Sequence, residues 1–227
     1  MNVIKGLLKK DLLNLASYKQ SLLVIIAFLA IFSAFNKGMV QCMPIAVSTA
    51  MGMIVLSTFN YDEIAKADSF ILSFPTNRKE VVKEKYILVI SSMILGGIIG
   101  IILTIVFNSL IRMVNPEFQV IIEYNSLLMT TLSGMFGIAL VEAIQIPSIY
   151  KWGAEKGRIQ MFILIFLIIA IIVGGVFLFS HLELGIDLEA IGNFLSNYGL
   201  IILIITTMVM LYISYKISCK IYCKKSE

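Results

Sequence analysis

Long apolar runs separated by short polar segments dominate the pattern of this chain. Six of these runs are close to the length of about 20 residues that a helix needs to cross the hydrocarbon core of a bilayer. They cover residues 20–36, 40–59, 86–108, 126–146, 159–180 and 199–217. The pattern therefore predicts an all-α integral membrane protein with six transmembrane helices, forming a single domain over residues 1–227.

Ahead of the first run, apolar residues recur every three or four positions, as on one face of a helix. They are Val3, Ile4, Leu7, Leu8, Leu12 and Leu15, with Lys5, Lys9 and Asp11 between them. Because lysines favour anionic headgroups, residues 1–18 are predicted to form an amphipathic helix on the membrane surface. The charges in this segment also break the apolar stretch that a cleavable signal peptide needs.

The segment before the last run, residues 181–198, combines acidic and large apolar side chains. Its glycines at 185 and 192, with Gly199 just after, divide it into pieces too short to span a membrane. The pattern predicts one or two short interfacial or re-entrant helices at the outer surface. A disordered polar loop is the alternative, and the large apolar residues argue against it.

Composition and charge agree with a membrane protein and give it an orientation. Apolar residues make up 59% of the chain, against roughly 45 to 50% in soluble domains. If both termini are cytoplasmic, 16 of the 18 Lys and Arg residues lie on the inner side, and only Lys37 and Arg112 lie outside. This is the positive-inside pattern. Since the basic residues flank apolar runs and form no basic face on a soluble domain, nucleic-acid binding is not expected.

Few residues inside the predicted spans carry reactive chemistry. Glu142 is the exception, with Gln145 on the same helical face, and the pair either bonds a neighbouring helix or serves as a gate or substrate contact. Three methionines, Met51, Met53 and Met135, are candidates to line a variable apolar pathway, although core filling is the other use of methionine. The small-residue patterns Gly96-x-x-x-Gly100 and Ser133-x-x-x-Gly137, with Gly97 and Gly134, predict close helix packing.

Catalytic, ATP-binding and metal sites are not expected in this chain. It contains no Gly-x-x-x-x-Gly-Lys-Ser/Thr loop, no Gly-x-Ser-x-Gly and no His-Glu-x-x-His. Its single histidine and three cysteines do not suggest a metal site. Cys219 and Cys223, one helical turn apart, are expected to be reduced, with palmitoylation as the alternative.

The polar segment 60–85 between the second and third runs is too apolar for a solvated linker. Pro75 disfavours helix at Phe74, and Asn77 with Glu80 three residues later has the spacing of a capping box that starts a new helix. The sequence predicts a short helix, a break and a second helix leading into the third span. Its exposed apolar and basic groups indicate contact with a protein partner.

Two blocks of residues resemble those of a known family. The first is Tyr61-Asp62-Glu63 followed by Leu72-Ser73-Phe74-Pro75-x-x-Arg78-Lys79-x-x-Val82-x-x-Lys85-Tyr86, and the second is Pro147-x-x-Tyr150-Lys151-x-Gly153-x-Glu155-Lys156-Gly157-Arg158. Over essentially its whole length, the chain resembles the small six-span permeases of type-2 ABC exporters from Gram-positive bacteria. Permeases that export phenol-soluble modulins, which are amphipathic helical peptides, look nearest, but those with bacteriocin or lantibiotic cargo are similar.

The resemblance implies a permease in the bacterial cell membrane without an ATPase site of its own. Residues 60–85 would be a coupling loop that docks on a separate ATP-binding cassette subunit, and the second block would be a smaller inner contact. The implied contact residues are Leu72, Phe74, Pro75, Arg78, Lys79, Tyr150 and Lys151, while Asp62 and Glu63 would order the loop by pairing with nearby cations.

The resemblance also implies the other members of the assembly. Two permease chains, as a homodimer or heterodimer, would work with two ATPase subunits that bind the ATP and Mg, and this chain would bind no cofactor itself. The cargo would be an amphipathic or hydrophobic peptide. The alternative class is an intramembrane enzyme or a non-transporting membrane assembly factor, which would act without an ATPase partner.

Overall fold

The structure of the protein is a computed structural model that describes residues 2–35, 39–71, 76–114, 123–181 and 188–224. Helices account for nearly all of these residues, which contain no strand. The helices are α1 (Asn2–Ala16), α2 (Lys19–Phe35), α3 (Met39–Ile64), α4 (Ala67–Ile71), α5 (Arg78–Val114), α6 (Tyr124–Trp152), α7 (Ala154–His181) and α8 (Leu188–Lys224).

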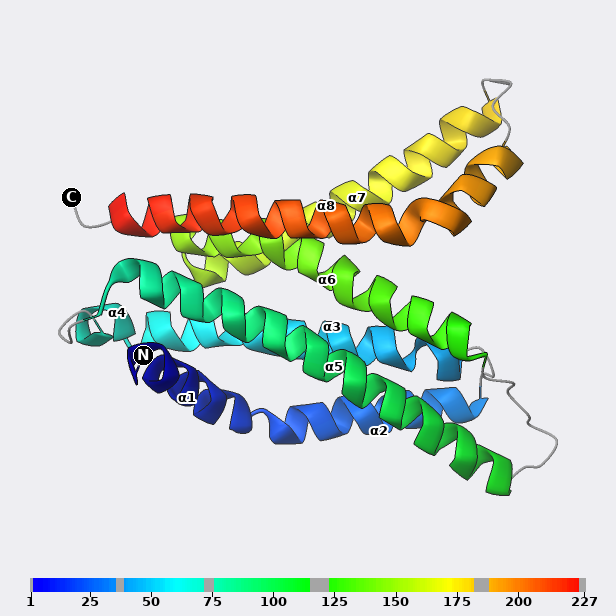
Figure 1. Cartoon of the computed structure of the whole chain (residues 1–227), viewed down its shortest axis with the longest axis horizontal. Helices are drawn as coiled ribbons and strands as arrows, with labels where there is room; N and C mark the ends of the chain where they lie inside the picture. Colours follow the sequence, from blue (N-terminus) through cyan, green and yellow to red (C-terminus); the bar gives the residue numbers. More distant parts are fainter. Residues whose placement is uncertain (1, 36–38, 72–75, 115–122, 182–187, 225–227) are drawn as a thin grey trace.

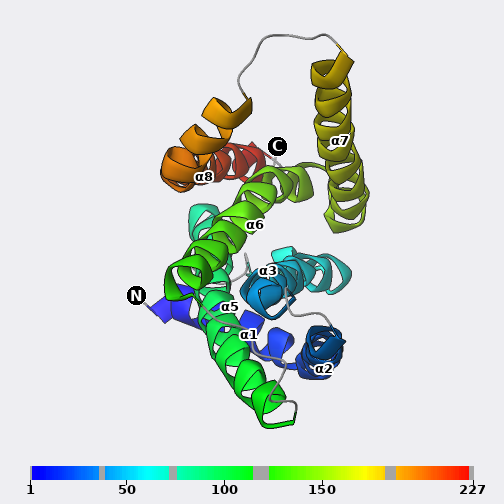
Figure 2. The same ribbon diagram turned by 90° about the vertical axis from the view of Figure 1, so that its right-hand side faces the viewer.

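The long helices form a bundle around α3, α5 and α6 (Figure 1). The most extensive packing joins α3 to α5, and α6 packs against α8 and α3. Viewed from the end, α6 lies between the α3 and α5 pair and the α7 and α8 pair, with α7 on the outside of the bundle (Figure 2). The start of α1, the short helix α4 and the end of α8 all lie at one end of the bundle, which we call the basic end for the residues described below (Figure 1).

Small residues let α5 approach the backbone of α3 closely. A Cβ atom added at Gly96 would lie 2.9 Å from Cα of Ser48, and one added at Gly100 would lie 2.5 Å from Cα of Pro44. Both distances are too short for any side chain, so the first small-residue pattern is a packing face, as predicted.

The second small-residue pattern also packs closely, but through Gly134 and not through the two residues that define its spacing. Gly134 is the residue in close contact, because an added Cβ would lie 2.8 Å from Cα of Ile45 on α3. At Gly137 an added Cβ would meet nothing within 4 Å, and Ser133 is exposed. The spacing of four was therefore misleading in α6.

Each predicted span falls within or closely matches one helix. Four helices are long and apolar enough to cross a membrane by themselves, within α3, α5, α6 and α8. The α1 and α2 pair bends by 56° at Ser17 and Tyr18 and could count as a fifth span. The predicted fifth run lies in α7, whose side chains are described only in part. The chain is therefore an all-helical, multi-pass protein over the described residues, and the number of six spans stays a prediction.

The structure differs from the sequence-based expectation for residues 181–198. Residues 182–187 lie outside the described part, but from Leu188 onward the segment is the beginning of α8 and not a separate short helix. Gly192 and Gly199 both lie inside this helix, since a glycine costs a helix only about 1 kcal/mol relative to alanine. Figure 1 shows this first part of α8 set at an angle to the rest of the helix.

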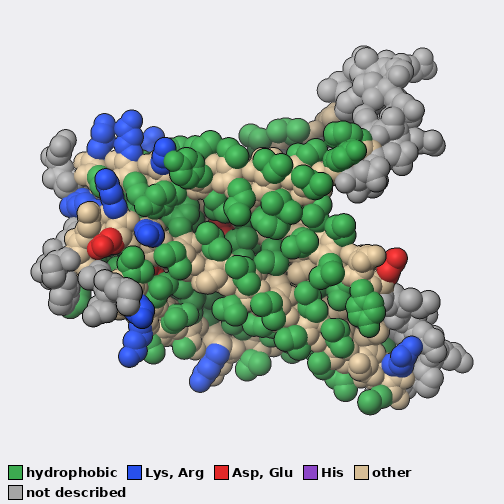
Figure 3. Space-filling model, in the orientation of Figure 1, with side chains coloured by type: hydrophobic (Ala, Val, Ile, Leu, Met, Phe, Trp, Pro, Cys, Tyr) green, Lys and Arg blue, Asp and Glu red, His purple; other side chains and the backbone are tan. Residues whose placement is uncertain are grey.

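Basic side chains gather at one end of the molecule, as the distribution of Lys and Arg predicted. In the space-filling view most of the Lys and Arg side chains lie at the basic end, while the sides of the bundle are apolar (Figure 3). Arg112, in the last turn of α5, lies at the opposite end of that helix. The cytoplasmic location of the basic end stays a prediction that follows from the positive-inside pattern.

Candidate functional site

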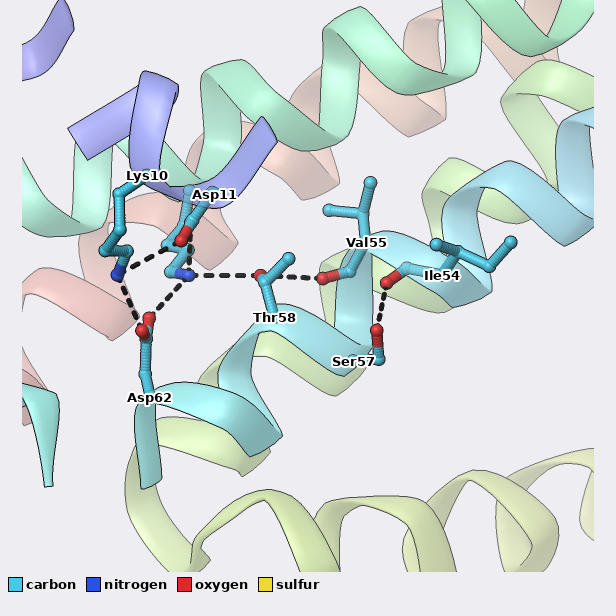
Figure 4. Close-up of polar contacts among 8 residues, drawn as sticks. Lys10, Asp11, Ile54, Val55, Ser57, Thr58 and Asp62 are labelled. Carbon is cyan, nitrogen blue, oxygen red and sulfur yellow. Dashed lines mark hydrogen bonds and ion pairs between the residues drawn. The ribbon is translucent and has the colours of Figure 1, made fainter. Parts of the chain in front are cut away.

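Four charged side chains from three helices form a compact cluster at the basic end. This charge cluster consists of Lys10 and Asp11 of α1, Asp62 of α3 and Lys85 of α5. Nζ of Lys85 lies 2.5 Å from Oδ2 of Asp11 and 2.7 Å from Oδ2 of Asp62. Nζ of Lys10 lies 2.6 Å from Oδ1 of Asp62 and 3.0 Å from Oδ1 of Asp11. Figure 4 shows the labelled side chains of Lys10, Asp11 and Asp62 turned toward one another.

Burial differs sharply within the charge cluster. The side chain of Asp11 is 0% exposed and that of Lys85 is 3% exposed, whereas Lys10 is 33% exposed. Lys85 also donates to Oγ1 of Thr58 at 3.0 Å and lies 4.9 Å from the ring centre of Phe59. Lys85 of α5 therefore connects Asp11 of α1 with Thr58 of α3. Removing either member of the buried Lys85–Asp11 pair would leave an uncompensated charge.

The more exposed lysine of the charge cluster, Lys10, keeps its charge. Burial alone lowers the pKa of Lys10, but hydrogen bonding and attraction to the carboxylates of Asp62 and Asp11 more than offset this. The pKa is raised as a result, and Lys10 is fully charged at neutral pH.

The position of Asp11 corrects the reading of the N-terminal helix. The sequence pattern placed Asp11 on the polar face, but the structure buries it beside Leu7, while Leu12 is 55% exposed. Asp11 is four residues from both Leu7 and Leu15, which places all three on one helical face. That spacing was the available signal.

Aromatic rings join the ends of α3, α6 and α8 beside the charge cluster. The ring of Phe59 meets that of Tyr150 edge to face at 5.5 Å, and Tyr150 lies 5.2 Å from the ring of Tyr222. The sequence missed Tyr222 and Phe59 as members of this site. A small pocket of about 100 Å³ lies among these rings and is also lined by Asp62 and Lys85.

Arg78 makes its contacts within the chain. Its Nη1 donates to the backbone oxygen of Tyr222 at 3.0 Å, and its guanidinium carbon lies 5.7 Å from the Tyr222 ring. Tyr222 lies in the last turn of α8, where carbonyl oxygens have no partner inside the helix, so Arg78 caps the end of α8. Lys79 and Lys151 are exposed, and Lys151 lies 4.4 Å from the ring of Trp152.

Glu63 fixes the junction between α6 and α7. Its Oε2 accepts a hydrogen bond of 2.5 Å from the backbone nitrogen of Ala154, the first residue of α7. Negative charge is favourable at the start of a helix. Gly153, between the two helices, has φ of 91°, and a Cβ there would lie 2.7 Å from Oε1 of Glu63. The two inner segments predicted to contact a partner are therefore held together in one structure.

The start of α5 has the predicted capping box. The backbone nitrogen of Asn77 donates to Oε2 of Glu80 at 3.2 Å, and Oδ1 of Asn77 accepts from the backbone nitrogen of Lys79 at 3.3 Å. The short helix α4 precedes it, which gives the predicted order of helix, break and helix. Leu72, Phe74 and Pro75 lie outside the described residues.

Several apolar side chains are exposed at the basic end beside the lysines. Ile64 is 74% exposed, Phe70 67% and Trp152 46%. We refer to Ile64, Phe70, Trp152, Lys79 and Lys151 as the docking face. These apolar and basic groups are exposed beyond the predicted membrane spans, and Lys151 adjoins Trp152. Exposed apolar groups together with basic ones are typical of a protein contact.

The methionines proposed for a pathway have different environments. Met51 packs against Gly96, and Met135 packs against Gly97, so both fill gaps between helices. Met53 is 45% exposed and lines a groove between α3 and α6, together with Ile45, Thr49, Ser133, Gly134, Gly137, Ile138 and Val141.

Glu142 and Gln145 are both buried in α6, where the sequence put them on one face. Glu142 is 0% exposed and lies against Gly52 of α3, where an added Cβ would come within 2.5 Å of its Oε1. Its carboxyl oxygens have no hydrogen-bond partner among the described residues. Gln145 is 5% exposed and lies beside two surface hollows.

A search of protein families matches residues 6–223 of the chain to a family described as ABC-2 family transporter protein. The match covers both inner segments, the charge cluster and all the long helices. Neither the curated proteins nor the solved structures gave a match.

Proposed function

Because the chain belongs to the ABC-2 family of transporter proteins, we propose that it exports amphipathic or hydrophobic peptides, driven by separate ATP-binding subunits. Membership of this family makes the chain a multi-pass permease subunit that associates with an ATP-binding cassette subunit in the membrane. The observation that carries the proposal is the docking face, whose exposed apolar and basic groups extend from helices that the buried contacts of Asp62 and Glu63 connect.

The docking face suits a contact with an ATPase because its side chains come from helices that buried contacts connect to one another. Exposed apolar groups at the centre of an interface and basic groups at its rim are typical of protein interfaces. Arg78 supports this surface from within by capping α8. Lys79 and Lys151, both exposed, are the better candidates for pairing with acidic groups of the partner.

Force applied to the docking face would be transmitted to the membrane helices through buried contacts. Asp62 and Glu63 lie in the last turn of α3, where Asp62 contacts α1 and α5 and Glu63 contacts the start of α7. Movement of the docking face would therefore move several spans together. This connection is the mechanical role we propose for these two carboxylates, which is broader than ordering one loop.

The cargo is proposed from the apolar character of the groove between α3 and α6. Met53 and Ile45 contribute flexible and branched apolar surface, and Thr49 and Ser133 add small hydroxyl groups. No charged side chain lines this groove among the described residues. Such a wall suits a peptide with an apolar face better than a small ion, for which fixed charges are usual.

A single groove open on one side does not enclose a path, so we propose that a second permease chain covers it. Two permease chains would then bind two ATP-binding subunits, each with its own ATP and Mg. The rival class, an intramembrane enzyme or an assembly factor, requires no ATPase partner. Partner binding therefore separates the two functions.

The test is copurification of this chain with a candidate ATP-binding cassette subunit from the same cell. We expect the tagged wild-type chain to retain that subunit, and Lys79→Glu with Lys151→Glu to lose at least tenfold of it, because opposite charges would become like charges. Arg112→Glu is the matched control, since Arg112 is an exposed basic residue at the far end of α5. Equal retention by the double variant would refute the docking face, and no retention by the wild type would refute the proposed function.

A further inference from the structure

An exposed row of side chains runs along α8, and the transport proposal does not use it. The row has seven residues at intervals of three or four, so they share one face of the helix. All seven are exposed, and they are Ile202, Ile205, Val209, Tyr212, Lys216, Lys220 and Lys224. We call this row the α8 stripe.

The α8 stripe faces away from the rest of the bundle, because the opposite face of α8 is buried against α5 and α6. Oγ1 of Thr207 lies 3.3 Å from the backbone oxygen of Phe136 in α6, and the Tyr86 hydroxyl of α5 hydrogen-bonds to both Ser214 and Ser218. These three α8 residues are 0 to 3% exposed. Figure 1 shows α8 along one edge of the bundle. The α8 stripe is therefore open to a partner outside this chain.

The three lysines of the α8 stripe have no acidic partner in the part of the chain that the structure describes. Neither Lys216, Lys220 nor Lys224 forms an ion pair with a described residue, and Nζ of Lys216 lies 4.6 Å from the ring centre of Tyr212. The acidic residue of α8, Glu189, belongs to the first turn of the helix, far from the lysines. Figure 3 shows Lys and Arg side chains gathered over this end of α8. The row of positive charge therefore attracts an anionic group from outside the chain.

The order of groups along the α8 stripe matches the order of layers in a membrane. The predicted sixth span, residues 199–217, contains the apolar members and ends within one turn of Lys216. Tyr212 lies just before this boundary, where aromatic residues are enriched in membrane proteins. Side chains of an α-helix lean toward its N-terminus, so lysines at the end of α8 lean back toward the lipid phosphates. An acyl chain can follow the apolar members while its phosphate meets Lys216 and Lys220.

From this arrangement we propose that the α8 stripe binds an anionic phospholipid from the leaflet at the basic end. Phosphatidylglycerol has this chemistry, since its phosphate charge is not balanced within the headgroup. Phosphatidylethanolamine and phosphatidylcholine each carry an ammonium group that balances the phosphate. A second copy of this chain suits the α8 stripe less well, because a symmetric contact would bring two rows of lysines together. The site does not depend on peptide export.

The first test measures lipid binding to the purified full-length chain by native mass spectrometry. Phosphatidylglycerol, phosphatidylethanolamine and phosphatidylcholine with identical acyl chains are the probes. We expect phosphatidylglycerol to bind about tenfold more tightly than either of the other two lipids, which is the effect of one or two lysines near an anionic headgroup. Equal binding of the three lipids by the wild type would overturn the proposal.

Two triple variants with the same loss of charge separate the α8 stripe from the net charge of the chain. The first, Lys216→Gln with Lys220→Gln and Lys224→Gln, should lose the preference for phosphatidylglycerol. The control removes three exposed lysines of α2, α5 and α7 and should keep the preference; it combines Lys19→Gln, Lys83→Gln and Lys156→Gln. A preference that survives the first variant would overturn the proposal, and so would an equal loss in both. Loss of a copurifying ATP-binding subunit by the first variant, with unchanged lipid preference, would assign the row to a protein contact instead.

A fluorescence experiment locates the lipid with all three lysines in place. Trp152→Phe removes the single tryptophan of the chain, and Tyr212→Trp then places a reporter in the α8 stripe. In phosphatidylcholine vesicles, phosphatidylglycerol brominated on its acyl chains should quench this reporter more strongly than equally brominated phosphatidylcholine at the same mole fraction. A reporter at the exposed Phe166 of α7, made by Phe166→Trp, should be quenched equally by both lipids. Equal quenching at position 212 would overturn the proposal, and elution of each variant as a single species confirms that it is folded.

Discussion

Lys85 should be the charge whose removal destabilises this protein most. It is 3% exposed and reaches both Asp11 and Asp62, so Lys85→Met leaves the fully buried Asp11 with only the more exposed Lys10 as a partner. The methionine keeps a similar length and flexibility. The variant therefore removes the charge with little change in packing.

The expected loss follows from the burial of the partners. Breaking a buried ion pair by removing one member costs about 3 to 5 kcal/mol. We expect a value near the lower end, roughly 3 kcal/mol, because Lys10 remains 3.0 Å from Asp11. Lys10→Met should cost only about 0 to 1 kcal/mol, since Lys10 is 33% exposed and surface pairs contribute little.

The assay is equilibrium denaturation of the purified chain in detergent micelles, followed by circular dichroism. Lys83→Met is the matched control, because Lys83 is an exposed lysine of the same helix. Lys85→Met combined with Asp11→Leu should recover most of the loss, since an apolar pair replaces the unpaired charge. If Lys85→Met and Lys83→Met unfolded at the same denaturant concentration, the charge cluster would not hold α1 to α3 and α5.

Two glycines should also be sensitive to a single methyl group. Gly100→Ala would push α5 away from Cα of Pro44 and should lower the free energy of unfolding by about 1 to 3 kcal/mol. Gly137→Ala meets nothing within 4 Å and should be neutral or stabilising. Equal melting temperatures of the two variants would contradict the close packing of α3 and α5. Gly153→Ala forces a side chain into a left-handed conformation against the Glu63 carboxylate and should cost about 1 to 3 kcal/mol. Limited proteolysis between α6 and α7 measures this loss, and a cleavage rate equal to that of the wild type would exclude the strained junction.

Sequence reasoning was most successful where a signal is local. The positions of the helices follow from apolar runs, and the start of α5 follows from Asn77 and Glu80. The backbone nitrogen of Asn77 donates to the Glu80 carboxylate, and Oδ1 of Asn77 accepts from the backbone nitrogen of Lys79. A capping box requires only residues within one turn, so it can be predicted from four consecutive residues. The basic end was predictable for a similar reason, because charge counts beside each run need no knowledge of packing.

The charge cluster could not be assembled from the sequence because its members are far apart along the chain. Asp11 contacts Lys85, 74 residues later, and nothing local reveals the pairing. Arg78 is a similar case, since it binds the backbone of Tyr222, 144 residues later. The motif around Arg78 predicts a contact with a partner, which stays a prediction, and nothing in it reveals this second contact inside the chain.

Glycine patterns gave a mixed result for a geometric reason. Gly96 and Gly100 both face α3, but in α6 the contact is made by Gly134 and not by Gly137. Helical spacing tells which residues share a face but not which face meets a neighbour. The neighbour is fixed by tertiary packing, which the sequence pattern does not contain.

The most direct test of the central claim is peptide transport by reconstituted vesicles. The chain and its ATP-binding subunit would be placed together in proteoliposomes, and movement of a fluorescent amphipathic helical peptide across the membrane would be followed after ATP is added. We predict transport only when both subunits and hydrolysable ATP are present. Peptide movement at the same rate without the ATP-binding subunit, or no ATP-dependent movement of any amphipathic peptide by the complete pair, would contradict the account.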